Sequence, residues 1–221
     1  MIRELRAYSK SETATGRRLT PGGTQLPLME AFYTLQGEGA HNGRAAFFIR
    51  LGGCDVGCVW CDVKESWNAD HHPVVSVDAI LASALQHPCR LAVITGGEPL
   101  MYELDALTTA LHKVGFATHL ETSGSHPLSG RWDWICLSPK KFKPALPEVF
   151  ERADELKVIV YNRSDLNWAE EQALRVSNSC ILLLQPEWSR HEQVMPLIIE
   201  HIKANPRWRI SLQCHKYMDI P

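Results

Sequence analysis

The feature that most restricts the fold is an alternation of strand-like and helix-like segments along the chain. Apolar, β-branched runs predict strands at residues 45–51, 91–95, 117–121, 133–138, 156–161, 180–185 and 208–213. Helix-like stretches lie at 76–86, which opens with Ser76 as an N-cap, at 103–115, which ends at Gly115, and at 191–205, which Pro196 should kink or split. The alternation predicts an α/β fold with a parallel sheet, either open or rolled into a barrel.

The length of 221 residues suits one well-buried domain, and the composition excludes several classes of protein. A formal net charge of -2 gives no general electrostatic reason to bind nucleic acid directly. No apolar run is long enough to span a membrane. Residues 1–27 are polar and lack the apolar core of a secretory signal, so we expect a loose N-terminal arm there and a single domain over residues 28–221. Because the seven cysteines form no disulfide framework, we expect a cytoplasmic protein.

Unusual polar and Gly/Pro-rich pieces follow six of the predicted strands. They are the cysteine-rich stretch at 54–61, "TGGEP" at 95–99, "ETSG" at 121–124, "SPK" at 138–140, "QPEW" at 185–188 and "QCHKY" at 213–217. In parallel α/β sheets and barrels, ligands bind at the carboxyl ends of the strands. Strand ends are often polar for no functional reason, but six such pieces on one edge predict a binding site there.

The cysteine-rich stretch "CDVGCVWCD" places three thiols within eight residues. Structural zinc needs a fourth ligand at a similarly tight spacing, and the nearest histidines follow no zinc-finger pattern. A redox pair of Cys58 and Cys61 would leave Cys54 unexplained and lacks a helix start to lower the thiol pKa. The glycines around the cysteines indicate a loop, so the three cysteines are not simply packed in the core. A 4Fe-4S cluster held by three cysteines fits the number of thiols and leaves one iron open for a small molecule.

Two motifs together resemble a known superfamily. The spacing Cys54-x3-Cys58-x2-Cys61, with an aromatic residue before the last cysteine, is similar to the signature of the radical S-adenosylmethionine enzymes. The stretch "TGGEP" resembles the Gly-Gly-Glu-Pro motif of the same superfamily, which contacts the methionyl amino group of the cofactor. Two glycines would let the backbone approach that amine closely.

Further matches narrow the resemblance to the 7-carboxy-7-deazaguanine synthase family. They are "FYTLQGEG", "FIRLGGC", "TGGEP", "ETSG", "SPK", "LQP" and the C-terminal "HKYMDIP", in order from residue 30 to residue 221. The resemblance implies a contracted, partial βα barrel, a homodimer, and an external electron donor such as flavodoxin. It also implies a lyase that converts 6-carboxytetrahydropterin to 7-carboxy-7-deazaguanine with loss of ammonia, a step in the biosynthesis of the modified tRNA base queuosine.

The family's functional positions carry over residue by residue. Cys54, Cys58 and Cys61 match the cluster ligands that generate the reacting radical. The positions that match S-adenosylmethionine-binding residues are Trp60, Cys61, Asp62, Gly96, Gly97, Glu98, Ser138, Pro139, Lys140, Gln185, Pro186, Glu187 and Trp188. The positions assigned to the pterin are Leu35, Gln36, Gly37, Glu38, Arg50, Thr95, Glu121 and the terminal Pro221.

Several of these roles remain open at the level of sequence. Arg50 could pair bidentately with the substrate carboxylate, or form a structural bridge to Asp62. Glu38 and Glu121 could accept hydrogen bonds from the pterin or from the cofactor ribose. Magnesium is doubtful, because many family members have a threonine after Cys-Asp that helps to hold Mg²⁺, and this chain has Val63 there.

Three other readings use the same cysteines. A glycyl-radical-activating enzyme has the same spacing but would need a surface for its protein partner. A non-catalytic iron–sulfur electron carrier needs neither an open iron nor "TGGEP". A zinc-stapled binding module would bind no S-adenosylmethionine.

Overall fold

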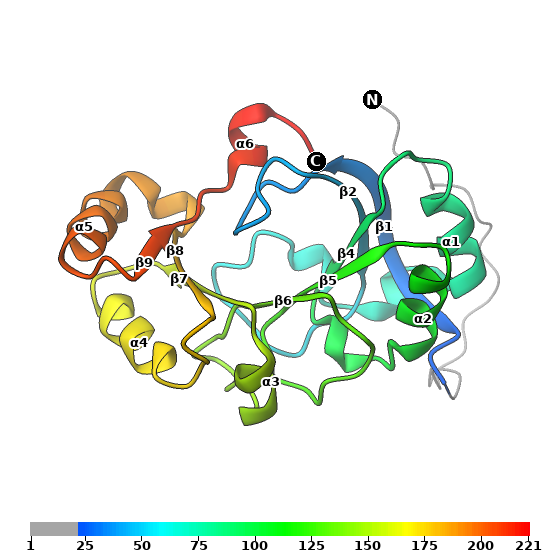
Figure 1. The fold of residues 1–221 in the computed structure, drawn as a ribbon, viewed down its shortest axis with the longest axis horizontal. Coiled ribbons are helices and arrows are strands. Elements are labelled where there is room, and N and C mark those ends of the chain that lie inside the picture. Colours follow the sequence, from blue (N-terminus) through cyan, green and yellow to red (C-terminus); the bar gives the residue numbers. More distant parts are fainter. Residues whose placement is uncertain (1–21) are drawn as a thin grey trace.

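The computed structural model describes residues 22–221, in which a curved sheet carries helices along its outer side (Figure 1). The strand order is β3-β1-β2-β4-β5-β6-β7-β8-β9. The strands are β1 (Gln25–Leu35), β2 (Ala45–Leu51), β3 (Val74–Ser76), β4 (Leu91–Gly96), β5 (Ala117–Thr122), β6 (Trp134–Leu137), β7 (Glu155–Val160), β8 (Ile181–Pro186) and β9 (Trp208–Ile210). All pairs from β2 to β9 are parallel, which confirms the predicted parallel sheet.

The two strands that the sequence did not predict are β1 and β3. Strand β1 lies between β2 and β3 and is antiparallel to both. Pro27 lowers the strand propensity of this segment, and it is tolerated because it pairs with Val74 at the edge of the sheet. The expected domain start at Leu28 falls inside β1, and Leu26 is already 1% exposed. Residues 25–27 of the expected arm thus belong to the sheet, and residues 1–21 lie outside the described residues.

The helices follow the strands as the alternation predicts. They are α1 (Val77–Ala84), α2 (Asp105–Lys113), α3 (Pro147–Arg152), α4 (Ser164–Ala173), α5 (His191–Ala204) and α6 (Cys214–Met218), with short 3-10 turns η1 (Lys64–Ser66), η2 (Ala69–His71), η3 (Pro99–Met101) and η4 (Trp188–Arg190). Ser76 caps α1 by accepting from the Ala79 amide at 3.2 Å, and Gly115 has the positive φ of a helix stop. Helix α5 runs through Pro196 without a split, because Val194 and Ile198 hold it in the core.

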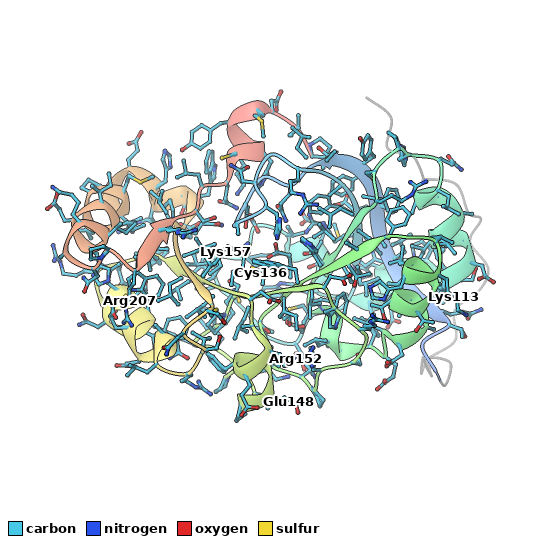
Figure 2. The ribbon with its side chains drawn as sticks, in the orientation of Figure 1. Lys113, Cys136, Glu148, Arg152, Lys157 and Arg207 are labelled. Atoms are coloured by element: carbon cyan, nitrogen blue, oxygen red, sulfur yellow. The ribbon has the colours of Figure 1, made fainter. Side chains whose placement is uncertain are left out.

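The register of the strands arranges the side chains of the concave face in layers across the sheet. One layer pairs Phe48 with Val93, Val93 with His119, and His119 with Trp134. The next layer toward the carboxyl ends is polar: Arg50 pairs with Thr95, Glu121 with Cys136, and Cys136 with Glu155. Figure 2 shows Cys136 and Lys157 in the hollow of the sheet, whereas Lys113, Glu148 and Arg207 lie on the outer surface. The polar layer therefore forms the floor of any site at this edge.

The position of Leu26 gives a test of the domain boundary. We expect Leu26→Ala to lower the free energy of unfolding by about 2–5 kcal/mol, because the truncation leaves a cavity between β1 and the core. Urea denaturation measures this change. The control is Leu174→Ala, whose side chain is 80% exposed and should cost little. Equal stability of the two variants would place residue 26 outside the folded domain.

Candidate functional site

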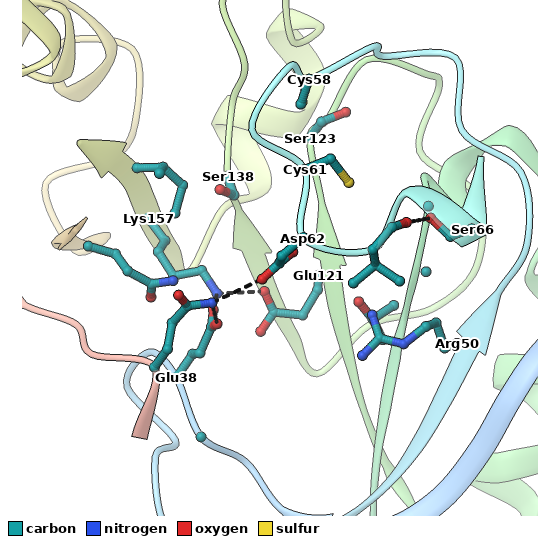
Figure 3. Close-up of a pocket in the computed structure, with 18 of the residues that line it drawn as sticks. Glu38, Arg50, Cys58, Cys61, Asp62, Ser66, Glu121, Ser123, Ser138 and Lys157 are labelled. Carbon is teal, nitrogen blue, oxygen red and sulfur yellow. Dashed lines mark hydrogen bonds and ion pairs between the residues drawn. The ribbon is translucent and has the colours of Figure 1, made fainter. Parts of the chain in front are cut away.

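A cavity of about 540 Å³ lies on the concave face, at the carboxyl ends of the strands (Figure 3). This volume is typical of a small-molecule site. Of the residues that the sequence assigned to cluster, cofactor or substrate, only Pro139 is absent from its lining. The lining also contains residues that the sequence did not assign, namely Phe32, Phe48, Val56, Val63, Ser66, Trp67, Thr122, Ser123, Lys157, Ile159, Gln213, His215 and Lys216.

The three predicted cluster cysteines lie on the loop after β2 and all line the cavity. They are free thiols, and Cys58 is buried. The pKa of Cys58 is raised to about 11, chiefly by burial; the charge of Lys140 opposes this rise, and the neighbouring thiols of Cys54 and Cys61 add to it. Thiols this close repel one another once ionised, so a cationic group among them would favour the thiolate form. The donor set therefore fits a cationic iron–sulfur cluster.

The base of the cysteine loop is attached to its neighbours through the backbone. The Gly53 amide donates to Ser66 O at 2.6 Å, and the Cys54 amide donates to Trp67 O at 3.1 Å. Farther along the loop, Asp55 lies 2.6 Å from Lys143 Nζ and 2.9 Å from His126 Nε2. These contacts connect the loop to η1 and to the segments that follow β5 and β6.

Gly97 of "TGGEP" lies against the cysteine loop. Its amide donates to Leu51 O at 3.0 Å, and the next amide, of Glu98, donates to Gly53 O at 2.9 Å. A Cβ at position 97 would lie 2.2 Å from Gly53 O, so only glycine fits. From the sequence we expected this glycine to let the backbone approach a ligand closely. In the structure it allows two loop backbones to pack together.

Glu98 is 1% exposed and accepts four hydrogen bonds from the protein. One carboxylate oxygen accepts from the Leu100 amide at 2.9 Å and from Thr122 Oγ1 at 2.6 Å. The other accepts from the Ser123 amide at 2.8 Å and from Ser123 Oγ at 2.5 Å. The carboxylate that we expected to serve the cofactor thus connects the end of β4 to the end of β5.

The acidic side of the cavity contains a lysine that the sequence analysis missed. Lys157 Nζ donates to Glu38 Oε2 at 2.6 Å and to Glu121 Oε2 at 3.0 Å (Figure 3). Gln36 Nε2 donates to Glu121 Oε1 at 3.2 Å, so the loop after β1 contacts the end of β5. The available signal was one charged residue inside the apolar run "LKVIVY", because a lysine in a fully buried strand needs a partner.

Arg50 and Asp62 do not form the alternative bridge that the sequence left open. Arg50 Nε donates to Glu30 Oε1 at 2.7 Å, on the neighbouring strand β1. Asp62 accepts from Lys216 Nζ of α6 at 2.9 Å. Lys216 also lies 5.0 Å from the ring centroid of Trp188. Helix α6 therefore joins the cysteine loop to the loop after β8 and brings the C-terminal residues, with Pro221, to the cavity.

The remaining cofactor positions lie on the opposite wall. Lys140 Nζ donates to Ser138 O at 2.5 Å and to Ser138 Oγ at 2.6 Å, and it lies 5.8 Å from the ring centroid of Trp60. Burial lowers the pKa of Lys140. Gln185 accepts from Ser211 Oγ at 2.7 Å, whose hydroxyl in turn accepts from the Gly39 amide.

The sequence matches the family model described as the Radical SAM superfamily over residues 48–162. With three thiols and a glycine turn at one edge of a curved parallel sheet, the chain is a radical S-adenosylmethionine protein, a class that uses a 4Fe-4S cluster and S-adenosylmethionine. Relatives named 7-carboxy-7-deazaguanine synthase are 54% identical in Flavobacterium psychrophilum, over 90% of this chain and 94% of the relative, and 36% identical in Escherichia coli strain K12, over 89% and 99%. The chain belongs to the 7-carboxy-7-deazaguanine synthase family.

A solved structure agrees with this assignment. The crystal structure of QueE from Escherichia coli superimposes with a TM-score of 0.79 at 35% identity, over 88% of this chain and 96% of that chain. A helix capable of crossing a membrane does not occur among residues 22–221.

The hydrogen bonds of Glu98 give a test of its structural role. We expect Glu98→Gln to lower the free energy of unfolding by about 2–4 kcal/mol, because an amide has one acceptor oxygen for four buried donors. Chemical denaturation of the metal-free protein measures this without any contribution from a ligand. The matched control is Glu171→Gln, on an exposed position of α4. A stability equal to that of the control would show that these four bonds are dispensable.

Proposed function

We propose that this chain catalyses the conversion of 6-carboxytetrahydropterin to 7-carboxy-7-deazaguanine with loss of ammonia, a step in queuosine biosynthesis. The observation that carries the proposal is one cavity with three thiols on its cysteine loop, an arginine on one side and a pair of carboxylates on the other. This polarity matches a substrate with a carboxylate at one end and a donor-rich heterocycle at the other. The family membership of nearly the whole chain gives independent support.

Cys54, Cys58 and Cys61 are proposed as the ligands of the 4Fe-4S cluster, and S-adenosylmethionine is proposed to bind beside them. Bound together, the two supply the radical that removes hydrogen from the pterin. The other proposed cofactor positions that line the cavity are Trp60, Gly96, Gly97, Ser138, Lys140 and residues 185–188. The Lys140 ammonium is half-buried, which lowers its pKa, and its positive charge in turn lowers the pKa of Cys58.

Arg50 is proposed to bind the carboxylate of the substrate. Its Nε is occupied by Glu30, and among residues 22–221 its two terminal nitrogens have no protein partner. A guanidinium held by one nitrogen and open at the other two is oriented for bidentate pairing with a carboxylate. Glu38 and Glu121, with Gln36, are proposed to face the pterin ring, and Leu35, Gly37, Thr95 and Pro221 to complete its walls.

The oligomeric state and the electron donor are also proposals. The family resemblance implies a homodimer and a low-potential electron donor such as flavodoxin. The glycyl-radical-activating alternative is not favoured, because relatives with the synthase name match this chain over 94–99% of their own length. An electron carrier or a zinc module does not explain a cavity lined by "TGGEP" and the acidic pair.

Anaerobic turnover tests the function and the ligand set together. We expect the reconstituted protein to convert 6-carboxytetrahydropterin to 7-carboxy-7-deazaguanine, detected by mass spectrometry. Cys58→Ala should lose the brown cluster absorption and all measurable turnover, because one of three ligands is gone. Cys89→Ala, a buried thiol outside the cavity, is the control and should keep both. Full iron content in Cys58→Ala would refute the ligand assignment, and no product from the wild type would refute the function.

We expect turnover to be nearly independent of added Mg²⁺. The side chain of Val63 offers no oxygen, and its carbonyl already accepts from Ser66 Oγ at 2.6 Å and from the Ser66 amide at 3.0 Å. Arg50 supplies positive charge at this side of the cavity without a metal. Lys64, which follows Val63 in the sequence, is exposed, and its Nζ lies 5.9 Å from the Trp67 ring centroid.

The measurement is the initial rate in metal-stripped buffer with and without millimolar Mg²⁺. Val63→Thr restores the hydroxyl common in the family, so its rate should rise with Mg²⁺. A several-fold stimulation of the wild type would contradict the prediction.

A further inference from the structure

Lys157 is a buried ammonium that none of the assigned roles explains. It lies on β7 with 3% of its surface exposed, and its Nζ lies between two carboxylates that are distant in the sequence. Glu38 comes from the loop after β1, and Glu121 from the end of β5. Burying an ammonium is costly unless it is paired and fully hydrogen-bonded. An ammonium at this position therefore depends on both carboxylates for its partners.

Both carboxylates keep acceptor capacity that faces the cavity. The four oxygens accept two hydrogen bonds from Lys157, one from Gln213 to Glu38, and one from Gln36 to Glu121, and the Gln185 side chain also acts on Glu38. A carboxylate oxygen has two lone pairs, so each can accept a further bond. The two side chains are each 19% exposed and both line the cavity. One ammonium between two carboxylates leaves one net negative charge, on oxygen atoms that can accept hydrogen bonds from N–H donors.

Strand β7 also holds the loop that carries Glu38. The Ala40 amide donates to Glu155 Oε2 at 2.8 Å, and Glu155 lies two residues before Lys157 on the same face of the strand. The Glu38 amide donates to Gln36 Oε1 at 3.0 Å, so the loop is braced on itself as well. The position of Glu38 in the cavity thus depends on two side chains of β7, of which Lys157 contacts the carboxylate directly.

The electrostatics agree with this geometry. Burial by itself would raise the pKa of Glu38, but the charge and the hydrogen bond of Lys157 outweigh it and lower the pKa to about 2. A carboxyl with a depressed pKa is ionised throughout the neutral range, and its contribution is lost only as the pH falls toward that value. Without the ammonium, burial would dominate, and Glu38 would take up a proton at a higher pH.

We propose that Lys157 is a positioning residue, which holds Glu38 and Glu121 as a pair of carboxyl acceptors for the N–H-rich edge of the bound heterocycle. The proposal rests on the proposed function and deepens it. Ligands that present two adjacent N–H donors, as a 2-aminopyrimidinone ring does, would be selected over isosteres without the amino group. Such an isostere leaves buried acceptors unpaired, which is why sites of this kind discriminate strongly.

The test uses binding rather than turnover, so that it does not depend on radical chemistry. The probe is 6-carboxypterin, a redox-stable analogue, added to the reconstituted protein with S-adenosylmethionine from about pH 5.5 to 7.5. For the wild type we expect a dissociation constant that is nearly constant over this range. For Lys157→Met we expect binding at least about tenfold weaker at the acidic end, with partial recovery at the neutral end, where Glu38 again ionises.

Lys157 also acts on other titratable groups around Glu38. The double variant described below, in which residue 38 cannot titrate, measures the response of these groups to the loss of the ammonium. The titratable groups around Glu38 are Glu121 on β5, Cys136 on β6, Glu155 on β7, Lys140, Asp62, and His215 on α6. Lys203→Met makes the same chemical change on the exposed surface of α5 and should behave as the wild type. A merely structural role of Lys157 predicts a loss that does not vary with pH, or no loss, and either result would overturn the proposal.

A second variant covers the case in which Lys157→Met does not fold. The double variant Lys157→Met/Glu38→Gln removes one charge of each sign and keeps the net charge of the cavity floor. We expect it to retain the cluster and to bind the probe more weakly than the wild type at every pH. Wild-type affinity in the double variant would overturn the proposal. Wild-type protein that does not bind the probe would refute the proposed function itself, which separates the two failures.

Discussion

The concave face of the sheet contains charged groups, and the pairing of these charges determines where the surrounding segments lie. Lys157 is buried on β7, and it is stable there because carboxylates from β5 and from the β1–β2 loop reach it. That loop supplies Glu38, and the side chain of Gln213, which precedes α6, donates from its Nε2 to the same carboxylate. The segments around one wall of the cavity therefore converge on a single ammonium.

A second pairing at the other wall works through hydrogen bonds and close backbone contact. Glu98 joins the ends of β4 and β5, while the adjacent Gly97 packs against the carbonyl of Gly53. Gly97 and Glu98 of "TGGEP" thus hold the protein's own loops together. The crystal structure of QueE from Escherichia coli keeps the fold with a TM-score of 0.79 at 35% identity, so most positions of the fold tolerate exchange. Position 97 has no space for even one methyl group, so it does not tolerate such exchange.

Much of the fold and of the site was predictable because both follow from local patterns. Apolar runs identified the parallel strands, and polar motifs after them identified the edge at which the cavity lies. What the sequence could not provide were the pairings between distant segments. The partner of Arg50 is Glu30 across β1 and β2, and β1 itself was obscured by Pro27. Lys157 stood in an apolar run with no local sign of Glu38 or Glu121, more than thirty residues away in each case.

The attachment of the cysteine loop has a consequence for how folding and metal uptake are related. Backbone bonds hold Gly53 and Cys54 to η1 and Glu98 to Gly53, while Asp55 contacts His126 and Lys143. The free energy that orders the base of the cysteine loop thus comes from the folding of the chain itself. In small zinc domains, by contrast, the metal must supply the energy that orders the ligands. We therefore expect assembly of the cluster to resemble ligand binding to a folded scaffold more than metal-driven folding.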